Sequence, residues 1–504
     1  MNKFNIQFRK MYEEESEQLV AKDFKSNENS QTSMDLAKTI ILASIPLILT
    51  VMSTYSFNTI NLMFLGKYNE PELLSAVGFG TTWLITFGMG LSIGLAIGLN
   101  VYASHAYGAR NFHRLGLLYQ KCMVINVIPI LIMAASTLII EPALVHFNFD
   151  HQFARDVRIF TQASLPCLIG YALFYSTVYF LMAQRTFYIG LILSFPAACI
   201  HPLWCYLFID VMQFKVTGAA LALGASYWLM TLAIFIYCKY WYKNQQVWIP
   251  WTRDCLDDIG SFIVDLSSVG ITVYLGWIFF EINTIMIAFL NDMNIMAGHV
   301  AALNFFYMIT IPNLEISTSA ASLLGNAAGE GNTKLCLHIS KVTTWINGII
   351  STILVIFMGI YSDLIAQIYT TEENVGPITS DIILIYLIGF HADIYSDQLA
   401  FQLRALDQSA FVFKSFVLSN YGLGIIAALL FTFFFDMSYT GIWMAMNLSF
   451  WVNGLSYVWK LMRIDWDKII QYISKNMKGS TSNSTREEEE EDDDDDEEED
   501  VLTL

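Results

Sequence analysis

The stretch FIVDLSSVGITVYLGWIFFEINTIMIAFL, residues 262–290, decides the fold, because it is an apolar run long enough to cross a membrane. It carries one carboxylate, Glu281, deep inside. At about 1.5 Å per residue, Glu281 lies roughly 15 Å from Asn291, near the middle of a bilayer core about 30 Å thick. A carboxylate at that depth is costly unless it is protonated, paired or facing water. Glu281 is therefore a candidate ion, proton or substrate site.

The composition is that of a polytopic membrane protein. Of 504 residues, 55% are hydrophobic and 14% are charged, against about 25% charged residues in soluble domains. The net charge of −18 comes mostly from fourteen consecutive acids at 487–500, and without them it is −4. No basic patch indicates nucleic-acid binding. The chain has no CxxC, P-loop, GxSxG or HExxH motif. We therefore predict no metal, no cofactor and no enzymatic activity.

Twelve hydrophobic runs are long enough to span a membrane. We place them near residues 40–65, 73–102, 115–140, 160–183, 187–209, 217–240, 262–290, 296–324, 342–368, 382–403, 411–435 and 442–462. This predicts an all-α fold with one six-helix lobe over 36–242, a linker over 243–257 and a second six-helix lobe over 258–465. The polar residues 1–35 and the acidic tail 466–504 are predicted to be disordered.

Basic residues are distributed unevenly between the two sets of loops. Those after spans 2, 4, 6, 8 and 10 hold ten: Arg110, Arg114, Arg185, Lys239, Lys243, Arg253, Lys334, Lys341, Arg404 and Lys414. The opposite loops hold four: Lys67, Arg155, Arg158 and Lys215. The excess places the first set in the cytosol, together with both termini. A plasma membrane and a vacuolar membrane both fit this orientation.

The two halves of the chain repeat each other. AYGARN at 106–111 matches AAGEGN at 327–332, and VTGAALALGASYWL at 216–229 matches YTGIWMAMNLSFWV at 439–452. Each offset contains an even number of spans, so both halves have the same orientation in the membrane. Parallel repeats favour a transporter that works by alternating access around a cleft between the lobes, with membrane lipid around it.

Several acids lie inside predicted spans of the second half. Besides Glu281, Asp393 is about thirteen residues inside its span, and Asp397 follows one helical turn later on the same face. Like charges at that spacing favour protonation of one of them. Asp397 has a second interpretation, a solvated position near the cytosolic end. Glu281 and Asp393 are the leading candidates for cation or proton coupling.

Further polar and aromatic residues are weaker candidates. Glu315 is either a pathway acid or a structural one, and Asn100 is either a pathway group or a helix-packing amide. Trp277 and Tyr307 are candidates for a cleft that stacks flat organic cations, although most aromatic residues in such a chain only pack or face lipid.

Several segments together resemble the multidrug and toxic compound extrusion (MATE) family, over roughly residues 36–465. They are NLMFLGKYNEPELLSAVGFG at 61–80, ASHAYGARNFHRLG at 103–116, GNAAGEGN at 325–332 and QLRALDQ at 402–408. The resemblance implies two six-helix bundles around a V-shaped cleft and a monomer that exchanges small organic cations for protons or sodium ions. It also assigns coupling roles to Glu281 and Asp393. Three acids of the family pattern are missing: two fall on Gly276 and Asn100, and the third falls on Leu303 or Asn304.

We therefore expect an antiporter that exports organic cations, drugs or metabolites. Two alternatives remain open at this point. One is a flippase for lipid-linked precursors, which requires a broad basic cleft. The other is a membrane scaffold that uses the acidic tail to recruit a partner.

Overall fold

The computed structural model describes residues 32–68, 70–242, 245–370, 372 and 374–478. Within these ranges eleven helical segments are long and apolar enough to cross a membrane. A twelfth, α18 (Ser438–Arg463), has 26 residues and packs among them. The predicted all-α polytopic fold is confirmed. Most of the two predicted tails, including the acidic run 487–500, lies outside the described residues.

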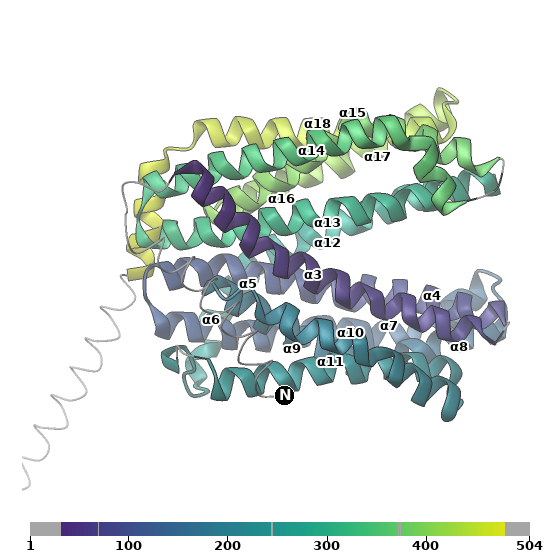
Figure 1. Ribbon diagram of the computed structural model, residues 1–504, viewed down its shortest axis with the longest axis horizontal. Coiled ribbons are helices and arrows are strands. Elements are labelled where there is room, and N and C mark those ends of the chain that lie inside the picture. Colours follow the sequence, from purple (N-terminus) through teal and green to yellow (C-terminus); the bar gives the residue numbers. More distant parts are fainter. Residues whose placement is uncertain (1–31, 69, 243–244, 371, 373, 479–504) are drawn as a thin grey trace, which may run out of the picture.

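The first half of the chain builds one bundle (Figure 1). Its helices are α3 (Ser33–Gly66), α4 (Pro71–Leu84), α5 (Gly90–Gly108), α6 (Phe112–Ile125), α7 (Val127–His146), α8 (His151–Ala163), α9 (Leu165–Ala183), α10 (Ile189–Cys205) and α11 (Lys215–Tyr240). Several of these are two parts of one span, as α4 and α5 are, joined through the π-helical turn Ile85–Met89. We call this bundle the N-lobe.

The second half builds a matching bundle, the C-lobe. Its helices are α12 (Ile259–Ala288), α13 (Met293–Glu330), α14 (Thr333–Tyr369), α15 (Val375–Ala405), α16 (Ser409–Phe416), α17 (Ile425–Leu429) and α18. The two lobes lie together at one end and diverge toward the other, which gives the predicted V shape (Figure 1). The end where they meet carries Arg110, Arg185, Lys334 and Arg404, and we call it the cationic end.

Helix α3 belongs to both lobes. Figure 1 shows it crossing from the C-lobe to the N-lobe. Near its start, Ser44 shares a hydrogen bond of 2.8 Å with Ser319 of α13. Nearer its end, the Asn61 side chain donates to the carbonyl of Ala219 in α11 at 3.1 Å. Helix α3, the first in the part of the chain that the structure describes, is therefore a direct physical link between the two lobes.

The lobes meet along a seam formed by α5 against α12 and α13. Glycine is required there because the backbones touch. A Cβ at Gly94 would lie 2.6 Å from the carbonyl oxygen of Gly270, and one at Gly108 would lie 2.0 Å from that of Asn326. His105 donates from Nε2 to the carbonyl of Ala405 at 2.8 Å. Small residues in membrane helices permit this close approach, which keeps the cationic end closed.

Residues 466–478 differ from the prediction, because they form a helix rather than part of a disordered tail. Asp465 starts it by accepting a hydrogen bond from the Lys468 amide, and this bond lowers the pKa of the Asp465 carboxyl. Ile470, Ile473 and Met477 fall on one face and are buried against the bundles. The composition of the acidic run misled the prediction, since the apolar periodicity before it is short.

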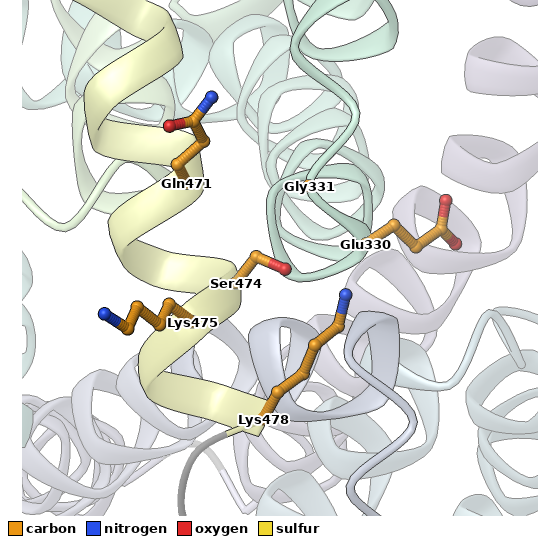
Figure 2. Close-up of a pocket in the computed structure, with 6 residues that line it drawn as sticks. All are labelled: Glu330, Gly331, Gln471, Ser474, Lys475 and Lys478. Carbon is orange, nitrogen blue, oxygen red and sulfur yellow. The ribbon is translucent and has the colours of Figure 1, made fainter.

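This C-terminal helix follows α18 of the C-lobe but is bonded to the N-lobe. The Asn111 side chain donates to the carbonyl of Met477 at 2.9 Å, and Arg114 donates to that of Asn476 at 3.1 Å. Figure 2 shows the recess between the helix and the end of α13, about 600 Å³ in volume, lined by Glu330, Gly331, Gln471, Ser474, Lys475 and Lys478. The recess lies at the cationic end, whereas Asp393 lies well inside α15.

Candidate functional site

Helix α15 presents three different faces inside the C-lobe. One faces α14, where His391 bonds to Ser351 and Gln398 donates to Thr344, both at 3.0 Å. A second faces α18, where Ser396 accepts a hydrogen bond from Asn453 at 2.8 Å. The third face, at i, i+7 and i+11, carries Tyr386, Asp393 and Asp397. At Tyr386 this third face packs against Phe306 of α13, with the ring centroids 4.1 Å apart.

Asp393 and Asp397 differ in burial, since Asp393 is half-buried and Asp397 is exposed. The Tyr386 hydroxyl donates to Asp393 Oδ2 at 2.5 Å. Asp397 is exposed although residues 394, 396 and 398–405 of the same helix are all buried. The exposure of Asp397 fits its second interpretation, a solvated position near the cytosolic end, which stays a prediction. Arg404, buried two turns away, interacts electrostatically with Asp397 and offsets part of the repulsion between the two acids.

Glu281 belongs to a separate group on α12. It shares a face with Trp277, one turn earlier, and interacts electrostatically with Tyr307 of α13. The rings of Trp277 and Tyr307 stack with their centroids 5.6 Å apart and 25° between their planes. Glu281 is half-buried, and no described residue makes a hydrogen bond or ion pair with it. The structure thus brings one acid and the two predicted aromatic residues together.

The two groups are connected through two tyrosines. Tyr307, beside Glu281, interacts electrostatically with Tyr386, which is the donor to Asp393. No hydrogen bond joins the two carboxylates among the residues that the structure describes. The two leading candidates for coupling therefore belong to separate groups of side chains.

Sequence reasoning missed three residues of this arrangement. Tyr386 lies seven residues before Asp393, on the same face of α15, and that spacing could have revealed it. Arg404 was assigned to a cytosolic loop because it ends a span. Tyr55 of α3 is exposed and interacts electrostatically with Tyr307 from the N-lobe side, and no pattern in the sequence indicates this contact.

The other two predicted pathway residues lie elsewhere, at the seam between the lobes. Asn100 is buried and donates to the carbonyl of Tyr179 at 3.1 Å and to Ser322 Oγ at 3.3 Å. Its structural interpretation, as a helix-packing amide, is the one that the contacts favour. Glu315 is buried on the α13 side of the same seam.

The comparison with known proteins decides the family. The family model MatE matches residues 46–207 and again 269–430, which together make up more than half of the chain. The chain belongs to the MatE family. The second match begins 223 residues after the first (46 to 269), in agreement with the internal repeat.

Similar proteins and structures cover nearly the whole MatE body. "Multidrug and toxin extrusion protein 1" of Danio rerio is 21% identical over 84% of this chain and 72% of its own length. "Protein DETOXIFICATION 16" of Arabidopsis thaliana is 23% identical over 90% of this chain and 93% of its own length. The crystal structure of the eukaryotic MATE transporter AtDTX14 superimposes with a TM-score of 0.81, at 20% identity, over 88% of this chain and 99% of that one.

The two MatE units are chemically unequal. Subtracting the 223-residue offset places Asn58 opposite Glu281 and Gly170 opposite Asp393. The same offset places Ser92 opposite Glu315. Glu281, Glu315 and Asp393 therefore belong to the second unit, while the first contributes neutral groups at the equivalent positions.

Proposed function

We propose that the protein is a secondary active antiporter that exports organic cations, among them drugs and metabolites, in exchange for protons. The observation that carries this proposal is the pair of acids on one face of α15 in the C-lobe, where Asp393 is half-buried and Asp397 is exposed. The stacked Trp277 and Tyr307 beside Glu281 supply aromatic faces for a flat cation. The names of the extrusion and detoxification relatives support the same direction of transport.

Each acid can couple the proton to the organic cation because it binds only one of the two at a time. A carboxylate in these largely neutral surroundings binds a proton or a cation, and occupation by one displaces the other. Tyr386 and Arg404 stabilise the charged forms of Asp393 and Asp397, so the pair is able to release protons when a cation arrives. Exchange follows if the lobes open alternately to the two sides of the membrane.

The basic residues give the orientation. With the cationic end in the cytosol, the structure is closed to the cytosol and its lobes diverge toward the outside or the vacuolar lumen. Protons enter the C-lobe from that side as the organic cation leaves. Both chain ends then lie in the cytosol.

Transport in proteoliposomes tests the function, with tetraethylammonium as the probe and with pH and sodium gradients imposed separately. We expect an inward proton gradient to drive efflux, and Glu281→Gln or Asp393→Asn to reduce it by tenfold or more. Asp381→Asn is the matched control, because Asp381 lies on α15 but bonds to Tyr439 far from the pair. Efflux that does not depend on the pH gradient, or that is normal in both acid variants, contradicts the proposal. Efflux that depends only on the sodium gradient would make Na⁺ the coupling ion in place of the proton.

A further inference from the structure

One face of α13 is a polar stripe that faces the N-lobe. Glu315, Ser319 and Ser322 fall at i, i+4 and i+7, so they share this face. Ser319 bonds to Ser44 of α3 at 2.8 Å. Ser322 bonds to Ser104 of α5 at 3.1 Å and donates to the carbonyl of Met182 in α9 at 3.2 Å. Two members of the stripe thus bind three N-lobe helices, while Glu315 continues it toward the diverging end.

Glu315 itself is enclosed but has no polar partner. Its side chain is only 3% exposed. No hydrogen bond or ion pair reaches it from any residue that the structure describes. Across the seam, Tyr175 and Tyr179 of α9 interact with it electrostatically. The Tyr175 hydroxyl is already bonded to Thr54 at 2.8 Å. An ionised carboxylate without a partner is strongly disfavoured at this depth, so the closed seam accommodates the neutral acid.

The neighbouring helices offer Glu315 no cation. From α9 it faces the two tyrosines, which are neutral. The contacts of its stripe with α3 and α5 are through neutral hydroxyl and amide groups. On the α14 side, Asn347 donates to Ser317 at 3.0 Å. The Asp393–Asp397 pair of α15 is engaged with Tyr386 and Arg404 instead. Separation of the lobes would open this seam and bring bulk water to Glu315.

We propose that Glu315 is a proton-exchange site of the lobe interface, separate from the C-lobe acids. While the seam is closed, the carboxyl holds a proton. When the lobes part at the cationic end, water reaches the stripe and the proton leaves to the cytosol. This inference rests on the proposed antiport, because it ties the release of one proton to the opening of the seam itself, whichever cation occupies the C-lobe.

Linkage between the proton and the seam fixes the sign and size of the effect. The closed state binds the proton and the open state releases it, so a higher pH favours the open state. For a single proton, the ratio of open to closed molecules rises by up to tenfold per pH unit. Glu315→Gln removes this dependence, because the amide is neutral at every pH.

The test measures opening of the seam without any transported substrate. The full-length chain in nanodiscs carries Ser322→Cys on the stripe, and Cys199→Ser removes the exposed native thiol. The labelling rate with a membrane-impermeant maleimide is measured between pH 6 and 8. Because thiol reactivity also rises with pH, the readout is the ratio of the rate with Glu315 intact to the rate with Glu315→Gln.

We expect this ratio to rise with pH, by up to tenfold per unit, and to rise equally in a Glu281→Gln background. A ratio that stays constant overturns the proposal. If the ratio stays constant and Glu315→Gln also loses tetraethylammonium binding, the proposal is overturned and Glu315 is instead a binding residue for the organic cation. Glu315→Leu, neutral and of similar size, serves as a second variant and is expected to behave like Glu315→Gln. Absence of proton-driven efflux contradicts the antiport proposal but leaves this ratio measurable.

Discussion

Adding one methyl group at Gly108 should force the cationic end of the protein open. A Cβ there would lie 2.0 Å from the carbonyl oxygen of Asn326, whereas real Cβ contacts stay beyond 3.0 Å, so the two backbones must separate by at least 1 Å. Neither backbone can rotate away as a side chain would. Forced repacking of this kind costs about 1–3 kcal/mol. Since the cost falls only on the closed state, Gly108→Ala should shift the balance between closed and open molecules by about 5- to 150-fold.

Spin labels report the shift directly. His113 of α6 and Lys334 of α14 are exposed at the cationic end, one in each lobe. We expect Gly108→Ala to move the His113→Cys/Lys334→Cys distance distribution in nanodiscs toward longer distances. Gly78→Ala is the matched control, because Gly78 lies inside α4 with no atom within 4 Å of the added Cβ. Identical distributions for the two variants would refute the idea that backbone contact holds this end closed.

Two further predictions concern the C-lobe pair and the C-terminal helix. Tyr386→Phe removes the hydrogen-bond donor to Asp393, and a bond to a charged group is worth about 1.5–3 kcal/mol, so tetraethylammonium binding at pH 7 should weaken roughly tenfold or more in a filter assay. Tyr395→Phe is the control and should not weaken binding, because Tyr395 points at Gly348 of α14. Equal affinities of the two variants for tetraethylammonium would exclude Tyr386 from the site. A chain ending after Lys478 should keep its Tm and its transport activity. A chain ending after Asp465 should have a lower Tm, because it exposes the surface covered by Ile470, Ile473 and Met477. Each lost side chain should reduce the stability by about 1.5–3 kcal/mol. Loss of all function on removal of residues 479–504 would instead favour the scaffold alternative.

The fold could be predicted well from the sequence because each membrane span is a long hydrophobic run. Hydrophobic runs fix the spans, and an acid such as Glu281 or Asp393 stands out against them. The repeat between 106–111 and 327–332 could also be recognised, because the two segments end equivalent spans at the closed end of the lobes.

What the sequence could not give was the arrangement between spans. Whether Glu281 touches Asp393 depends on how α12 and α15 are rotated, and the structure places Tyr307 and Tyr386 between them. Glu315 could be read as a pathway acid or a structural one until its stripe was seen against the N-lobe. Periodicity shows which residues share a face of a helix, but only the packed structure shows which other helix that face contacts.

The C-terminal helix also has a consequence for biosynthesis. Its bond to Asn111 joins residues 366 positions apart, so the N-lobe emerges from the ribosome and enters the membrane long before its partner for that surface exists. Domains generally fold as units during synthesis, with the N-terminal one first. The closed end of this protein is therefore completed only by residues 466–478, the last helix among the described residues. A nascent chain that stops short of residue 466 already contains every span, but it still lacks the segment that completes the contact between the lobes.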